Sequence, residues 1–106
     1  MSFPVHHAVG TARHRPQDEC GCPSWVEHWR RNTGSRRANC VVIGCPRRVE
    51  VGAHVYLRTG GKLYIVGMCS PCNLSFRGQR FQIDERTWIT EARYLETCVG
   101  FGEDDE

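Results

Sequence analysis

The sequence contains no apolar stretch long enough to cross a membrane, and aromatic residues make up only 9% of it. The segment from Met1 to Asp18 lacks the apolar run of a secretory signal and instead carries three histidines and two arginines. The seven cysteines are an odd number, which fits poorly with a closed set of disulfides. We therefore expect no membrane partner and a cytoplasmic protein, in which thiols stay reduced and can bind metal.

Acidic residues are missing between Arg30 and Arg48, a segment that holds six arginines, whereas Asp84 to Glu106 holds eight acidic residues and two arginines. The arginine doublets are interleaved with small polar residues, and forked guanidinium groups in that setting suit a phosphate backbone. We therefore expect this region to bind nucleic acid, with a solvated polar surface as the alternative. The six residues are Arg30, Arg31, Arg36, Arg37, Arg47 and Arg48.

Two short cysteine pairs are the strongest signal in the chain. A protein of 106 residues buries only a modest core and commonly needs a disulfide or a metal for stability. Each pair offers two sulfurs from one tight turn, with Gly44 allowing the first turn to fold sharply, and this arrangement suits tetrahedral zinc. The predicted zinc ligands are Cys40, Cys45, Cys69 and Cys72.

The chain order predicts three parts: a flexible N-terminal arm over 1–19, a zinc-bound domain over 20–98 and an acidic tail over 99–106. Within the domain, Ser24 and Glu27 have the spacing of a capping box that begins a helix ending at Gly34. One face of this helix gathers the residues expected to dock on the core, Trp25, His28 and Trp29.

A second metal site is an alternative role for the remaining cysteines. A histidine between two tryptophans is commonly a packed core residue, and three thiols without a metal are the competing interpretation. If a site forms there, it ties the two ends of the domain together. Its ligands would be Cys20, Cys22, His28 and Cys98.

The rest of the domain predicts a small α+β fold. Residues 49–57 and 63–66 have the β-branched and aromatic composition of a hairpin, with a turn at Gly60 and Gly61. Ser70 is expected to cap a short helix over 71–76 that stops at Gly78. Further along, 80–83 predicts one more short strand, whereas 87–95 fits a helix or a strand equally well.

The run Gly52-Ala53-His54-Val55, a hairpin and Cys69-Ser70-Pro71-Cys72-Asn73 resembles the zinc-stapled members of the HNH (ββα-metal) endonuclease family. The resemblance covers roughly residues 39–77. It implies a treble-clef domain in which His54 is the general base and Asn73 helps to hold a catalytic Mg²⁺ or Mn²⁺ ion.

The sequence departs from the HNH pattern at two positions. Ala53 stands where the family often has an acidic metal ligand, and Tyr64 stands where its middle asparagine belongs. A hard cation then requires a carboxylate from elsewhere, such as Asp84 or Glu85. The alternative role for His54 is to brace the hairpin against the zinc turn.

Three functions follow from these observations. The first is a zinc-binding HNH-like module that binds nucleic acid with weak or no catalysis, which the degenerate motif favours. The second is an active HNH-type metal-dependent endonuclease. The third is a protein-binding inhibitor or adaptor from a mobile element, in which zinc supplies rigidity alone.

Overall fold

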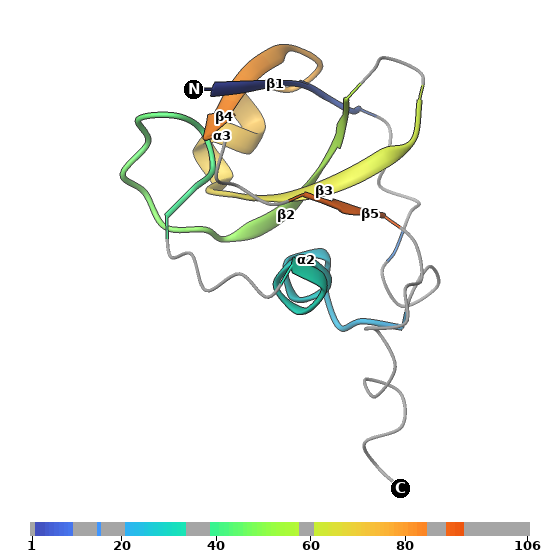
Figure 1. Ribbon diagram of the computed structural model, residues 1–106. Helices are drawn as coiled ribbons and strands as arrows, with labels where there is room; N and C mark the ends of the chain where they lie inside the picture. Colours follow the sequence, from blue (N-terminus) through green and yellow to red (C-terminus); the bar gives the residue numbers. More distant parts are fainter. Residues whose placement is uncertain are drawn as a thin grey trace, which may run out of the picture.

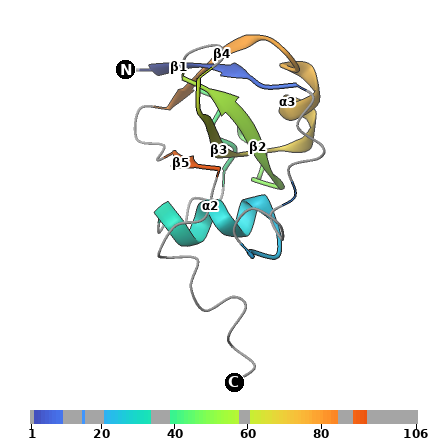
Figure 2. The ribbon, with the colours of Figure 1, turned by 90° about the vertical axis from the view of Figure 1, so that its right-hand side faces the viewer.

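The computed structural model describes residues 2–9, 15, 21–33, 39–57, 61–84 and 89–92. It is a small α+β fold in which an antiparallel five-stranded sheet, of order β4-β1-β2-β3-β5, separates two helices (Figures 1 and 2). The strands are β1 (Ser2–His7), β2 (Val51–Tyr56), β3 (Leu63–Met68), β4 (Arg80–Asp84) and β5 (Thr90–Glu91). The helices are α2 (Trp25–Thr33) and α3 (Ser70–Ser75). The predicted fold class is thus confirmed at the level of α+β architecture.

The predicted hairpin is formed by β2 and β3, with His54 opposite Ile65. Side chains alternate between the two faces of a strand, so Gly52 and His54 share the face covered by α2. Ala53 and Val55 point to the other face, on the side of α3. The predicted turn at Gly60 and Gly61 lies partly outside the described residues.

Helix α2 begins as predicted. The Glu27 backbone N–H donates to Ser24 Oγ at 3.1 Å, so the serine caps the helix. The helix packs closely on the hairpin, because a Cβ added at Gly67 would come within 2.7 Å of the Trp29 ring. One at Gly52 would come within 2.5 Å of the Trp25 backbone. The buried face consists of Trp25, His28, Trp29 and Thr33.

The N-terminal segment differs from the flexible arm that we predicted. Residues 2–7 form β1, which pairs with β4 along five residues from Ser2 to His6 and with β2 only at His6 and His7. Pro4 is tolerated because β1 has a single paired neighbour at that point, so the missing N–H breaks no second ladder. Val5 anchors the strand in the core. The rest of the predicted arm falls outside the described residues, apart from positions 8, 9 and 15.

The loop that follows Cys40 covers the outer edge of β4. The Ile43 N–H donates to the Gln82 carbonyl at 3.2 Å, and the Asp84 N–H donates to the Val41 carbonyl at 3.0 Å. The Val41 N–H in turn donates to the Gly67 carbonyl of β3 at 3.0 Å. This loop therefore links β4 to β3 beside the cysteines. The strand predicted over 80–83 is confirmed.

The region 87–95, which fitted a helix or a strand, contributes the two-residue strand β5 on the edge of β3. Its other residues, except 89 and 92, and the acidic tail over 99–106 lie outside the described part. Among the described residues, no helix is long and apolar enough to span a membrane.

Candidate metal centre

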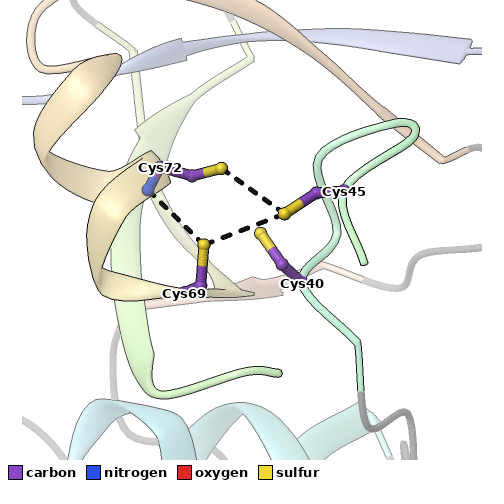
Figure 3. Close-up of side chains that lie close together, drawn as sticks. All are labelled: Cys40, Cys45, Cys69 and Cys72. Carbon is purple, nitrogen blue, oxygen red and sulfur yellow. Dashed lines mark hydrogen bonds between the residues drawn. The ribbon is translucent and has the colours of Figure 1, made fainter. Parts of the chain in front are cut away.

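Four cysteine side chains meet between the loop after Cys40 and the start of α3 (Figure 3). Their sulfur atoms all lie within 4.8 Å of one another, and Cys40 and Cys69 are fully buried. The Cys45 sulfur is 3.9 Å from that of Cys69 and 3.7 Å from that of Cys72. The two predicted pairs are therefore brought together, and none of the described cysteines forms a disulfide.

These separations match a tetrahedral zinc site. With zinc–sulfur bonds of about 2.3 Å, the sulfurs at two corners of a tetrahedron are roughly 3.8 Å apart. The measured separations of 3.7 and 3.9 Å lie on either side of that value. The cluster could thus hold a structural metal ion such as zinc without any large movement of the backbone.

The loop between Cys40 and Cys45 owes its shape to the glycine predicted for that role. Gly44 has a φ of +78°, a conformation that other residues rarely adopt. The Cys45 N–H donates to the Val42 carbonyl at 3.0 Å, and the Cys40 N–H donates to the Arg47 carbonyl at 2.8 Å. Both sulfurs are consequently turned toward the start of α3.

Helix α3 is capped by Cys69, whereas we predicted Ser70 as the cap. Cys69 has an extended backbone, and its sulfur accepts the Cys72 N–H at 3.4 Å. Ser70 is instead the first helical residue, and its N–H donates to the Glu50 carboxylate at 2.7 Å. The Cys-x-x-Cys spacing itself supplies the cap, because it places one sulfur above the first turn. Gly78 follows the helix with a φ of +71°.

Backbone N–H groups also point at the first cysteine pair. The Arg47 N–H donates to the Cys45 sulfur and lowers the pKa of that thiol, with burial acting in the opposite direction. Burial raises the pKa of the Cys40 thiol despite hydrogen bonds from the backbone of Cys69 and Val42. N–H groups aimed at sulfur stabilise the thiolate, which is the form that binds metal.

In the second pair, burial and neighbouring sulfurs raise the pKa of one thiol. Burial, followed by the neighbouring Cys69 and Cys45 sulfurs, raises the pKa of the Cys72 thiol far above its ordinary value. Four negative sulfurs cannot share this volume unless a cation offsets their repulsion. The cluster could therefore hold four thiolates only together with a cation such as zinc.

The two residues implied by the HNH resemblance are not brought together. His54 faces α2, with its ring 4.9 Å from that of Trp25 in an edge-on arrangement. Asn73 lies on α3, across the sheet, where its Oδ1 is 2.8 Å from Nε2 of His7. Because His7 pairs with Val55, the residue after His54, its side chain is on the opposite face.

His7 is a residue that the sequence interpretation missed. Its Nδ1 accepts the Gly78 N–H at 3.4 Å, so Nε2 carries the proton that it donates to Asn73. The ring is buried and links β1 to the helix that carries the second cysteine pair. No spacing pattern pointed to this role, because the contact spans 66 residues of sequence.

An oxygen-lined site for Mg²⁺ or Mn²⁺ has no support in the described residues. Within them, the four cysteines are the only group of three or more potential ligands, and Tyr64 lies on the face opposite His54. Asp84 is the last residue of β4, and its backbone N–H donates to the Val41 carbonyl. Glu85 lies outside the described part.

The predicted arginines fall into three groups. Arg47 and Arg48 are exposed and follow Cys45 after Pro46. On α2, Arg31 is exposed, and the Arg30 guanidinium lies 5.5 Å from the centre of the Trp29 ring. The doublet Arg36 and Arg37 is outside the described residues, so the structure does not place it.

Of the four ligands considered for a second metal site, the structure describes two. The Cys22 sulfur lies 3.6 Å from Nδ1 of His28, and both side chains are fully buried. Cys20 and Cys98 lie outside the described residues.

Comparison of the chain with family models, curated proteins and solved structures gives no match.

Proposed function

We propose that this protein is a zinc-stapled, treble-clef module that binds nucleic acid and does not carry out HNH-type cleavage. The observation that carries the proposal is the attachment of an exposed arginine doublet to the cysteine cluster. Arg47 and Arg48 follow Cys45 after a single proline, and both side chains are exposed. The HNH-like character of the domain is part of this proposal.

The cluster couples metal binding to the position of these arginines. The Arg47 N–H donates to the Cys45 sulfur, and its carbonyl accepts the Cys40 N–H at 2.8 Å. A metal ion that fixes both sulfurs therefore also fixes the backbone from which the two guanidinium groups project. Pre-ordered donors lose less conformational entropy when they contact phosphate.

The arrangement of the HNH-motif residues favours binding over cleavage. A general base must lie within hydrogen-bond reach of the water that it activates, beside the ion that holds the substrate. His54 and Asn73 are on opposite faces of the sheet, and His54 is only 7% exposed. This placement supports a role for His54 in packing the hairpin against α2, on the side away from the zinc turn that we predicted it to brace.

Salt dependence of binding tests the proposal. Fluorescence anisotropy with labelled duplex DNA and duplex RNA is expected to show affinity that falls steeply with salt. Arg47→Ala and Arg48→Ala should each reduce the slope of log affinity against log salt by about 0.9 for a lost DNA phosphate contact.

Lys62→Ala is the matched control, since it also removes one positive charge. Lys62 is 72% exposed and pairs with Glu91 at the end of β3 remote from Cys69. Its removal should leave the slope nearly unchanged. Equal effects of all three variants would indicate general attraction of charge, and an absence of binding at low salt would favour the protein-binding alternative.

Metal-dependent cleavage is the second measurement. Incubation of the zinc-loaded protein with DNA and RNA in Mg²⁺ or Mn²⁺ is expected to give no products. Robust cleavage that His54→Ala abolishes, in protein that keeps its zinc, would contradict the non-catalytic part of the proposal and favour the endonuclease.

A further inference from the structure

A second group of metal-binding side chains lies under α2, on the opposite side of the sheet from the four cysteines. Cys22 precedes the helix and His28 lies in its first half, and both are fully buried. The Cys22 sulfur is 3.6 Å from Nδ1 of His28. Two soft or borderline ligands are thus held side by side in an apolar environment.

The separation suits two ligands of one tetrahedral ion. Zinc–sulfur and zinc–nitrogen bonds of about 2.3 and 2.05 Å place the two ligand atoms roughly 3.5 to 3.6 Å apart. The observed distance of 3.6 Å agrees with this geometry. The same distance also allows a weak thiol hydrogen bond, so a ligand role for His28 also requires that the other ring nitrogen carries the proton.

The far nitrogen of His28 is oriented as in metal-bound histidines. Its Nε2 lies 2.8 Å from the Glu91 carbonyl oxygen, which only accepts, so Nε2 carries the proton. The lone pair of the neutral ring is consequently on Nδ1, which faces Cys22. A backbone carbonyl that fixes the ring in this way is the usual outer partner of a metal-ligating histidine.

The surroundings keep the ring in the neutral form that binds metal. Burial lowers the pKa of His28, against the opposing effect of its hydrogen bond to Glu91. The Asn32 amide also approaches Nδ1, at 3.1 Å, and donates to the His28 carbonyl at 2.9 Å. An ion bound at Nδ1 would displace this amide from the ring nitrogen, and Asn32 would keep its hydrogen bond to the His28 carbonyl.

We propose that Cys22 and His28 are two ligands of a second structural zinc, separate from the four-cysteine centre. The sequence supplies two further thiols, Cys20 two residues before Cys22 and Cys98 seven residues after Glu91. Seven residues reach at most roughly 24 Å, and Glu91 itself touches His28, so the chain length permits Cys98 to take part. Both thiols lie outside the described residues.

Such an ion would tie the segment before α2 to the helix by ligation, and the hydrogen bond from His28 to the Glu91 carbonyl would extend this link to β5. A thiolate–histidine nucleophile is a poor alternative explanation for the pair, because neither residue is accessible to a substrate. The proposal is independent of nucleic-acid binding, which concerns the opposite side of the sheet.

Zinc content measured by elemental analysis after gel filtration tests the proposal. The folded wild-type protein is expected to hold two zinc ions per chain. Replacement of zinc by ¹¹³Cd should give two NMR resonances, since the two sites differ in their ligands. His28→Asn is expected to lose one ion and one resonance while the other resonance persists.

His54→Asn is the matched control. His54 is also buried and packs edge-on against the Trp25 ring at 4.9 Å, close to the 5.1 Å of His28. It should keep both ions, so a loss confined to His28→Asn separates ligation from packing.

The wild-type measurement decides the matter even if His28→Asn fails to fold. One zinc per folded wild-type chain would overturn the proposal, as would two ions retained in folded His28→Asn. The proposal further requires that Cys20→Ser or Cys98→Ser, or both, lose the second ion. Retention of both ions in both variants would overturn it as well.

Discussion

The two faces of the sheet differ in how they are held together. On the side of α3, short-range patterns place four cysteines around a volume suited to one ion. On the side of α2, large rings pack against glycines of the hairpin, with the Trp29 ring over Gly67. Neighbouring residues of one strand therefore contribute to different structures. Ala53 belongs to the cysteine side and His54 to the tryptophan side.

The largest expected effect is loss of the four-cysteine centre. Structural zinc contributes about 10 to 16 kcal/mol of apparent binding energy in small domains, and this energy is coupled to folding. Cys69→Ser, or removal of metal with a chelator, is therefore expected to abolish the cooperative thermal transition in circular dichroism.

Ser70→Ala is the control for the cysteine variant, since it alters the next residue without removing a ligand. This variant should retain the zinc ion at the four-cysteine centre, and it should still unfold cooperatively. Protein that remains folded with no zinc bound would show that packing on the α2 side suffices alone.

Ala53→Asp is expected to give the next largest effect. It restores the acidic residue of the HNH motif in sequence, but Ala53 is 3% exposed and faces away from His54. An unpaired carboxylate buried there should cost about 3 to 5 kcal/mol of unfolding free energy. Urea denaturation of the zinc-loaded protein measures this loss.

Ala53→Ser is a suitable comparison, because its small side chain adds no charge. A stable Ala53→Asp protein with new Mg²⁺-dependent nuclease activity would contradict the assignment of the two residues to opposite faces.

The glycines of the hairpin test the packing of the α2 side. Overpacking of a core costs about 1 to 3 kcal/mol. Gly52→Ala is expected at the upper end, because the new Cβ would lie 2.5 Å from the Trp25 backbone and the whole helix must move. Gly67→Ala meets the Trp29 ring at 2.7 Å, and the ring can shift more easily than the helix. Chemical denaturation of the zinc-loaded variants gives the order.

Gly61→Ala, at an exposed position of the hairpin turn, is the control. If Gly52→Ala and Gly67→Ala are no less stable than this variant, the result would contradict the close packing of α2 on the sheet.

The sequence predicted several features that depend on local spacing, although it assigned the cap of α3 to Ser70 in place of Cys69. The cysteine pairs, the turn at Gly44 and the cap at Ser24 each involve residues within six positions of one another, so chain geometry alone indicates them. The hairpin was also predicted, because its composition favours strands.

Two features that depend on distant partners were not predicted. The strand at residues 2–7 contains Pro4 and two histidines, and it becomes a strand because β4 and β2 lie beside it. Similarly, the position of His54 in the HNH-like run indicated a partner in Asn73. In the structure, Asn73 instead bonds to His7, because strand alternation places His7 on the face of α3 and His54 on the other face. No local pattern indicated this contact.

The smallest expected effect is a coupling energy that separates these two partners of Asn73. Residues in contact show coupling of about 0.5 to 3 kcal/mol in double-mutant cycles, whereas independent sites add within about 0.5 kcal/mol. His7 and Asn73 share a hydrogen bond of 2.8 Å and should be coupled when each is replaced by alanine. His54 and Asn73 lie across the sheet from each other and should be additive. Unfolding free energies of the zinc-loaded single and double variants supply both cycles. Coupling between His54 and Asn73 that exceeds the coupling between His7 and Asn73 would restore the HNH pairing, because only a shared site could link two residues on opposite faces so strongly.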